Sequence, residues 1–276
     1  MWNHAAPRKR FAAPFAALLL AAISTVGFAD PSKPVVPHRV LFVGNSIIYT
    51  NNLPAVLHAL IQTQRPDAEV RIDMFAKGGA TLAETAADLR FRVALRNGHY
   101  DAVVLQERGG DAICAANAEA RGETACREMI RGERDLADAV RRAGASVYFL
   151  GTYQPMPQAS AALVEGERWL AARMPARYIE TSQTWQALRG RLPDLHWLYA
   201  EGDSHPGPAT TALLTVRSYA ALFGTDPQPA DICTSARRLT PRDGSEEVVP
   251  FESLIADAGP ATCLLTKTQV AQFIGR

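Results

Sequence analysis

A serine stands where an apolar stretch of the sequence stops. Val40-Leu41-Phe42-Val43 leads into Gly44-Asn45-Ser46, and apolar residues resume at Ile47. A serine at the carboxyl end of a strand can present its hydroxyl to a substrate, but the hydroxyl is a poor nucleophile until a base takes its proton. The surrounding residues do not match the G-x-S-x-G turn of the α/β-hydrolases. An ordinary glycine–serine turn gives the same pattern, so a catalytic Ser46 requires a base elsewhere in the chain.

The best candidate for that base is His205 in the stretch EGDSHPGP. Asp203 lies two positions before it and Glu201 lies four positions before it. A carboxylate this close in sequence can reach the imidazole Nδ1 atom and fix the tautomer of the ring. The alternative is a solvated loop histidine beside two acids. His196, which follows Asp194 in PDLHWLY, is a weaker rival base.

Two other stretches offer hydrogen-bond donors for a negatively charged oxygen. Gly78 and Gly79 in AKGGATLAE precede a helix pattern, and the missing side chains let backbone N–H groups approach a ligand closely. Gln106 ends the apolar stretch DAVVLQ, where its amide can donate to a developing oxyanion. The alternatives are a tight turn into a helix for the glycines and, for Glu107 and Arg108, a solvated pair at a strand end.

Apolar strand patterns alternate with longer helix patterns along the chain. Strands are expected at 39–44, 68–76, 101–106, 145–153 and 176–182, and helices at 53–61, 81–96, 119–143, 158–173 and 208–223. The alternation predicts an α/β fold, a flavodoxin-like three-layer α/β/α sandwich with a mostly parallel five-stranded sheet. Ligands bind beyond the carboxyl ends of parallel strands, so Ser46, Gly79 and Gln106 are expected to meet at one rim of the sheet.

Four stretches in this order resemble a known family. LFVGNSIIYTNNLP, GGATL, VVLQE and a late SHP are similar to the blocks of the SGNH hydrolases in the GDSL lipase/esterase superfamily, and most of all to the subgroup with a GNS block and an LQE block. The resemblance spans residues 38–224 and implies the SGNH-hydrolase fold. Residues 225–276 follow it and are expected to form a C-terminal extension packed on the domain.

The resemblance implies a role for each candidate in the catalytic reaction. Ser46 is implied as the nucleophile and His205 as the general base. The family's acid normally stands three residues before the histidine, where this chain has Gly202. Asp203 and Glu201 flank that position, and Asp203 is preferred because a loop absorbs a shift of one residue. The chemistry implied by the family requires no metal and no organic cofactor.

The implied oxyanion hole combines backbone and side-chain donors. It consists of the backbone N–H groups of Ser46 and Gly79 and the side-chain amide of Gln106. The third block of the family usually supplies an asparagine. The glutamine at this position can donate the same hydrogen bond, with one more methylene of reach.

The N-terminus has the pattern of a secretory signal peptide. Arg8-Lys9-Arg10 precedes an apolar stretch and small residues before Asp30, which predicts removal of residues 1–29 and a secreted or periplasmic protein without a membrane attachment. An uncleaved anchor is the alternative, and Pro14 and the short apolar span argue against it. The formal charge is +1 over 276 residues and no basic patch is present, so nucleic acid is not expected as a partner.

All four cysteines lie after the predicted cleavage site. An even number of cysteines in an exported chain indicates disulfides, and four cysteines allow three pairings. Cys114–Cys126 and Cys233–Cys263 are favoured because each pair lies within one local segment. A zinc site is the alternative, although the spacings are wide and no C-x-x-C stretch is present.

These features together predict a secreted or periplasmic serine esterase that acts on small acyl esters. An O-acetyl group on a glycan is a candidate substrate, an inference that rests on the resemblance and the predicted export. Two alternatives remain open. An envelope O-acyltransferase would use the same serine and pass the acyl group to a sugar. A non-catalytic glycan-binding protein on a decayed hydrolase scaffold is suggested by the shifted acid.

Overall fold

The computed structural model describes residues 1–2, 36–189, 198–199, 203–245, 247–272 and 274. Pro34–Arg276 forms one compact unit, and the description below concerns that unit. The predicted signal peptide, residues 1–29, falls almost entirely outside the described residues. No helix within the described ranges is long and apolar enough to span a membrane.

A parallel sheet of five strands forms the centre of the unit. The strands are β1 Arg39–Gly44, β2 Arg71–Ala76, β3 Ala102–Leu105, β4 Ser146–Leu150 and β5 Arg177–Ile179. Their order is β2-β1-β3-β4-β5 and every neighbouring pair is parallel. This is the flavodoxin-like order, so the predicted fold class is confirmed. The last four strands are shorter than predicted because polar or loop residues flank their apolar centres.

Both faces of the sheet are covered, which explains the unbroken apolar stretches. Alternate residues of β1 enter different cores: Val40 and Phe42 lie on one face, and Leu41 and Val43 lie on the other. All four side chains are fully buried. A strand buried on both faces favours apolar side chains at consecutive positions, so its sequence does not alternate.

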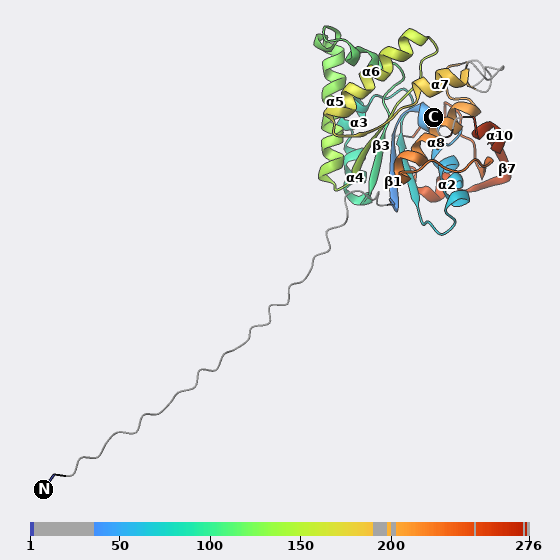
Figure 1. Ribbon diagram of the computed structural model, residues 1–276. Helices are drawn as coiled ribbons and strands as arrows, with labels where there is room; N and C mark the ends of the chain where they lie inside the picture. The colour runs from blue at the N-terminus through green and yellow to red at the C-terminus, as the bar shows by residue number, and fades with distance from the viewer. Residues whose placement is uncertain (3–35, 190–197, 200–202, 246, 273, 275–276) are drawn as a thin grey trace. The chain divides into compact units, whose positions relative to one another are not determined.

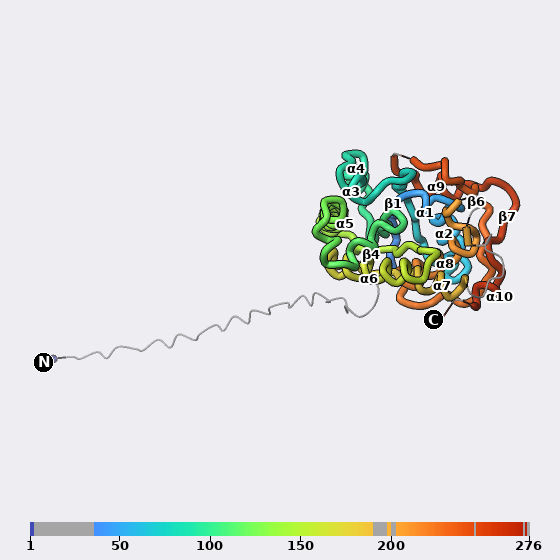
Figure 2. The backbone as a smooth tube through the Cα atoms, turned by 90° about the horizontal axis from the view of Figure 1, so that it is seen from above, coloured from blue at the N-terminus to red at the C-terminus, as the bar shows by residue number. Residues whose placement is uncertain are grey.

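Helices form the two outer layers. One face of the sheet is covered by α2 Leu53–Gln64, α7 Ser182–Arg189 and α8 Pro208–Phe223. The other face is covered by α3 Leu82–Ala87, α4 Leu89–Gly98, α5 Thr124–Arg142 and α6 Pro157–Arg173. Figure 1 shows β1 and β3 between these two groups, and the view from above in Figure 2 shows the same separation. Gly224 ends α8 in a left-handed conformation (φ +72°), as its position after the helix predicts.

One predicted helix is divided in two. Residues 81–96 were expected to form a single helix, but α3 ends and α4 begins at Asp88. The carboxylate of Asp88 accepts a hydrogen bond from the Arg90 N–H at 2.8 Å, and its extended backbone interrupts the helical hydrogen bonds. An aspartate inside a helix pattern can cap a new helix instead of continuing the old one. Thr81 and Glu84 form a capping box at the start of α3.

Two disulfides are present, and both have the predicted pairing. Cys114–Cys126 joins the 3₁₀ helix η1 Asp111–Ala116 to α5. Cys233–Cys263 joins β6 Ile232–Ala236 to β7 Asp257–Leu265, an antiparallel pair in the C-terminal part of the chain. Apolar residues of this hairpin belong to the same core as α2 and α8. The hairpin therefore packs behind those helices.

Candidate active site

One cavity lies where the loops after β1 to β4 meet the loop before α8. Its volume is about 360 Å³. Its lining comprises Asn45, Ser46 and Ile47 after β1, Gly79 after β2, Arg108 and Gly109 after β3, Tyr153, Gln154 and Pro155 after β4, and Tyr199, Ser204 and His205 before α8. Three predicted site residues, Ser46, Gly79 and His205, thus line the same cavity at the carboxyl end of the parallel sheet, where such folds bind ligands.

Ser46 is the first residue of the short helix α1, Ser46–Tyr49. Asn45 caps this helix: its backbone is extended, and its side-chain oxygen accepts a hydrogen bond from the Ile47 N–H at 3.2 Å. The chain therefore changes from strand to helix at the serine, whose side chain is half-buried in the cavity lining. Burial raises the pKa of the Tyr49 phenol, and a hydrogen bond with the Ser46 hydroxyl opposes that rise.

His205 and Asp203 form a close pair. The Nδ1 atom of His205 lies 2.9 Å from Oδ2 of Asp203, and the backbone N–H of His205 donates to Oδ1 at 2.8 Å. The geometry of this side-chain contact is not that of a hydrogen bond, so the two atoms are close without being hydrogen-bonded. The two side chains are 28% and 40% exposed, so solvent screens any electrostatic attraction between them. The alternative acid Glu201 and the rival base His196 lie outside the described residues.

The loop that carries His205 is held by backbone contacts on both sides. The Tyr153 hydroxyl donates to the Ser204 carbonyl at 2.9 Å, and the Gly207 N–H donates to the Leu198 carbonyl at 2.8 Å. Tyr153 itself stacks on Trp185, with ring centroids 5.4 Å apart. These contacts fix the loop against the core.

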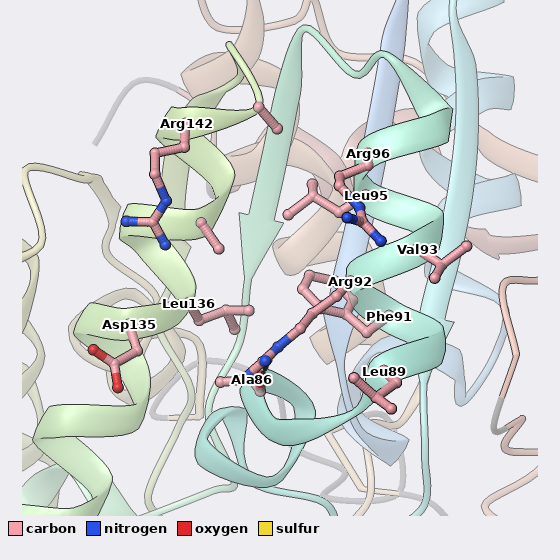
Figure 3. A pocket seen from close by; sticks show the side chains of 12 residues that line it. Ala86, Leu89, Phe91, Arg92, Val93, Leu95, Arg96, Asp135, Leu136 and Arg142 are labelled. Atoms are coloured by element: carbon pink, nitrogen blue, oxygen red, sulfur yellow. Dashed lines mark hydrogen bonds between the residues drawn. The ribbon is translucent and has the colours of Figure 1, made fainter.

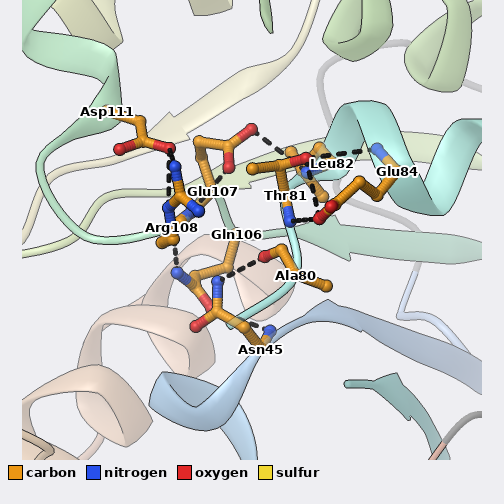
Figure 4. Close-up of polar contacts among 9 residues, drawn as sticks. All are labelled: Asn45, Ala80, Thr81, Leu82, Glu84, Gln106, Glu107, Arg108 and Asp111. Atoms are coloured by element: carbon orange, nitrogen blue, oxygen red, sulfur yellow. Dashed lines mark hydrogen bonds and ion pairs between the residues drawn. The ribbon is translucent and has the colours of Figure 1, made fainter. Parts of the chain in front are cut away.

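Gly79 completes the turn between β2 and α3. Its φ is +69°, a left-handed conformation that favours glycine, and a Cβ atom added there would meet nothing within 4 Å. The backbone conformation therefore explains the glycine, and the space beside it is open. The side-chain amide of Asn45 donates to the Ala80 carbonyl at 3.2 Å and ties this turn to the segment carrying Ser46 (Figure 4).

Gln106 lies behind the cavity. It is fully buried and is not part of the cavity lining. Its side-chain oxygen accepts from the Asn45 N–H at 3.4 Å, and its amide group donates to the Glu107 carbonyl. A Cβ atom on Gly44 would lie 2.7 Å from the Gln106 side-chain oxygen, so glycine at 44 makes room for this packing. The predicted oxyanion donation by Gln106 stays a prediction.

Glu107 is buried and belongs to a polar network, so the alternative of a solvated pair with Arg108 is wrong. Its two carboxylate oxygens accept from the Leu82 N–H at 3.2 Å and the Arg108 N–H at 2.6 Å (Figure 4). The Arg108 side chain pairs with Asp111 instead, at 2.8 Å. Glu107 therefore joins the end of β3 to the first turn of α3, just after the Gly79 turn.

A second buried carboxyl group faces Glu107 from α5. Glu133 is fully buried, and neither of its side-chain oxygens has a hydrogen-bond partner within the described residues. Burial, followed by repulsion from Glu107, raises the pKa of Glu133 well above its ordinary value. Burial also raises the pKa of Glu107 to about 7. Protonation of Glu133 removes a charge that burial disfavours and also removes its repulsion with Glu107.

Stability is therefore expected to fall as the pH rises through neutrality. In the unfolded chain these carboxyls ionise near their ordinary pKa of about 4.5, whereas in the folded chain the pKa of Glu107 is raised to about 7 and that of Glu133 is raised well above its ordinary value. Between these limits the folded state binds more protons, so rising pH favours unfolding. Glu133→Gln keeps an amide donor toward Glu107 and removes the ionisation, and we expect a flatter dependence of Tm on pH and a higher Tm at pH 8.

The expected change in the Tm of Glu133→Gln can be estimated, and α5 offers a control variant. Each kcal/mol of repulsion removed is expected to raise Tm by about 2–4 °C in a domain of this size. Glu128→Gln, an exposed position on the same helix, is the matched control and is expected to leave the slope unchanged. Equal slopes for wild type and Glu133→Gln between pH 5 and 8 would contradict the raised pKa of Glu133. Glu167, whose pKa burial also raises to about 7, leaves a residual slope in both proteins.

A larger cavity, of about 610 Å³, lies between α4 and α5 (Figure 3). Its lining includes apolar Phe91, Leu95 and Leu136 and cationic Arg96 and Arg142. It contains none of the predicted site residues and lies between helices of one outer layer. Volume alone therefore does not identify the candidate active site; the convergence of strand ends does.

Comparison with known proteins supports the fold. No family model and no curated protein matches the sequence. Among solved structures, LAE5, an α/β-hydrolase enzyme from the metagenome of Lake Arreo, Spain, has a TM-score of 0.52 at 16% identity over 67% of this chain and 94% of its own. Axe2, an acetylxylan esterase from Geobacillus stearothermophilus, has a TM-score of 0.52 at 15% identity over 67% of this chain and 93% of its own.

At these identities the similarity concerns the fold. The fold is the SGNH-type fold that the sequence resemblance implied, so that prediction is confirmed. The placement in the subgroup with GNS and LQE blocks stays a prediction.

Proposed function

We propose that this protein is a secreted or periplasmic serine esterase that hydrolyses small acyl esters. The observation that carries the proposal is that His205, with Asp203 2.9 Å from its Nδ1 atom, lines the same cavity as Ser46 and Gly79. The fold shared with an α/β-hydrolase and an acetylxylan esterase supports ester chemistry. The two disulfides are compatible with an oxidising compartment outside the cytoplasm.

The proposed reaction has two halves. In the first, the hydroxyl oxygen of Ser46 forms a bond to the acyl carbon while the imidazole of His205 takes the hydroxyl proton. The ester C–O bond then breaks, and the imidazolium returns the proton to the leaving alcohol. In the second, His205 takes a proton from water, the hydroxide displaces Ser46 from the acyl group, and the serine recovers its proton. Asp203 orients the ring throughout.

The negative charge on the carbonyl oxygen is proposed to rest on backbone donors. The N–H groups of Ser46 and Gly79 are the two principal donors, because both residues line the cavity. The Gln106 amide is bound to the Glu107 carbonyl in this structure and would have to turn to add a third donor.

We propose O-acetyl groups on glycans as the substrate class. The cavity of about 360 Å³ is near the lower end of the range for small-molecule sites, which suits a short acyl group. Axe2 is described as an acetylxylan esterase, and its fold is shared here. Both observations support a short acyl chain on a sugar more than a long acyl chain.

The test combines turnover with chemical labelling of the nucleophile. The chain from Asp30, with both disulfides formed, is incubated with a fluorophosphonate, and hydrolysis of p-nitrophenyl acetate is followed as labelling proceeds. We expect inhibition in proportion to labelling and a single phosphonylated peptide containing Ser46. Turnover that persists after full labelling, or a label on another residue, would contradict the assignment.

Product analysis separates the two alternatives. Acetylated xylo-oligosaccharide is incubated with and without an unacetylated sugar acceptor. Free acetate in both reactions supports the esterase. Acetyl transfer to the added acceptor supports the O-acyltransferase, and binding without either product supports the glycan-binding protein.

A further inference from the structure

Two consecutive asparagines follow the helix that begins with Ser46. Asn51 and Asn52 have φ values of +61° and +60°, a left-handed conformation that asparagine tolerates better than most residues. Both are buried, with 6% and 1% of their surface exposed. Their side chains bind different partners, although their backbone conformations are the same.

Asn51 connects the Ser46 segment to the His205 loop. Its amide nitrogen donates to the Pro206 carbonyl at 2.7 Å and to the Thr211 hydroxyl at 3.0 Å. Pro206 is the residue after His205, and Thr211 lies in the first turn of α8. One buried side chain thus bridges segments that are 155 residues apart in sequence.

Asn51 also connects both segments to the C-terminal part of the chain. Its side-chain oxygen accepts a hydrogen bond from the Arg238 guanidinium at 2.6 Å, and its backbone N–H donates to the Leu239 carbonyl at 2.9 Å. These partners fix the orientation of the amide, because the reverse orientation would place oxygen against the Pro206 carbonyl and NH₂ against a cation. Arg238 and Leu239 follow β6, which the Cys233–Cys263 disulfide joins to β7.

We propose that Asn51 is a positioning residue that sets His205 relative to Ser46, and that Arg238 makes the C-terminal hairpin part of the catalytic apparatus. The proposal rests on the proposed esterase function. Hydrogen bonds to a charged donor are stronger than neutral ones, so Arg238 holds the Asn51 amide in the orientation that the Pro206 carbonyl requires. A serine and its base act together only when their geometry is correct to a fraction of an ångström, and a displacement of about 1 Å can cost about 10²-fold in rate.

The neighbouring asparagine provides a matched control. The Asn52 amide donates to the carbonyls of Arg237 at 2.9 Å and Leu254 at 2.8 Å, and its oxygen caps α2 by accepting from the Ala55 N–H at 3.3 Å. These contacts attach the C-terminal part of the chain, as those of Asn51 do. They do not include the loop that carries His205.

The experiment compares Asn51→Asp with Asn52→Asp. Each substitution preserves size, tolerates the left-handed conformation and removes the amide donor. In Asn51→Asp the new carboxylate still accepts from Arg238 but faces the Pro206 carbonyl with an oxygen. We expect kcat for p-nitrophenyl acetate to fall about 10–10²-fold with little change in KM, and labelling by the fluorophosphonate to slow by the same factor. For Asn52→Asp we expect a lower Tm and a kcat within about threefold of wild type.

Arg238 supplies a second, independent pair of variants. Arg238→Ala frees the Asn51 oxygen and is expected to lower kcat several-fold, and Arg238→Lys, which keeps a cationic donor, is expected to restore most of the loss. A positioning role is overturned if Asn51→Asp and Asn52→Asp lose kcat equally, or if Asn51→Asp lowers only Tm. A wild-type kcat in Arg238→Ala would remove the hairpin from the proposal.

A measurement without turnover separates this proposal from the esterase assignment. Hydrogen exchange of the backbone amides in 203–207 is compared between the two asparagine variants in a Ser46→Ala background. Faster exchange in Asn51→Asp than in Asn52→Asp is expected if Asn51 holds the loop, whether or not the protein hydrolyses esters. Equal exchange in both variants would overturn the positioning role even if Ser46 proves to be the nucleophile.

Discussion

Replacing Ser46 by alanine is expected to lower kcat/KM for p-nitrophenyl acetate by about 10⁴–10⁶-fold, the usual result of removing a covalent nucleophile. The serine oxygen is the only atom proposed to bond to the acyl group, and alanine leaves the cavity without a replacement for it. The fold is expected to persist because the cap of α1 is the side chain of Asn45, and alanine is a good helix former. Circular dichroism and Tm are expected to match wild type.

A second serine in the cavity lining, Ser204, provides a control for the assignment of Ser46 as the nucleophile. Ser204 also lines the cavity, and its contact with the Tyr153 hydroxyl is through its backbone carbonyl. Ser204→Ala is therefore expected to retain the rate within about threefold, a small effect typical of a substitution that removes no catalytic contact. Equal rates for wild type and Ser46→Ala would show that the turnover arises elsewhere. The glycan-binding alternative would then be preferred.

The sheet was predictable because its strands are buried on both faces. Unbroken apolar stretches such as Val40-Leu41-Phe42-Val43 are uncommon outside buried parallel strands, and their alternation with helix patterns led to the correct fold class. The disulfide pairing was also predictable, since each cystine closes a local segment. The division at Asp88 was not, because the same aspartate can occupy an exposed helix position or cap a new helix, and packing decides between them.

The side-chain directions at the strand ends were not predictable from the sequence. Gln106 was expected to face the cavity, and in this structure it turns behind Asn45 into the space beside Gly44. A solvated pair with Arg108 was one alternative for Glu107, and in this structure Glu107 is buried, with Glu133 of α5 beside it. Both outcomes depend on contacts between segments far apart in the chain, which strand and helix patterns do not contain.

Asn51 is another residue whose contacts could not be predicted from the sequence. The stretch NNLP precedes a helix pattern, and Asn52 caps α2. Nothing in the local pattern assigns the two asparagines different partners. Two adjacent asparagines with φ near +60° form an uncommon backbone conformation, and the Asn51 side chain reaches the loop beside His205. Both features are seen only in the structure.

Replacing Asp203 by asparagine is expected to lower kcat by about 10²–10⁴-fold, the effect of removing the carboxylate that orients a catalytic histidine. The carboxylate contacts both the ring nitrogen and the backbone N–H of His205. Asparagine can keep the backbone contact through its oxygen, which leaves the NH₂ group to face Nδ1 and favours the tautomer that cannot accept the Ser46 proton at the other nitrogen. The loss is therefore expected in kcat, with KM nearly unchanged.

The exposure of the pair decides how that result is interpreted. Asp203 is 40% exposed, so water screens its charge, and a loss near the upper end of the range would indicate that orientation of the ring dominates. Asp226→Asn, at an exposed position of the C-terminal segment, controls for the change of net charge. If Asp203→Asn retains the wild-type rate within about threefold, as a substitution without a catalytic contact does, Asp203 is not the acid. Glu201→Gln then becomes the decisive variant, because its loss of rate would identify the other candidate, and its retention of rate would leave a Ser46–His205 dyad as the catalytic unit.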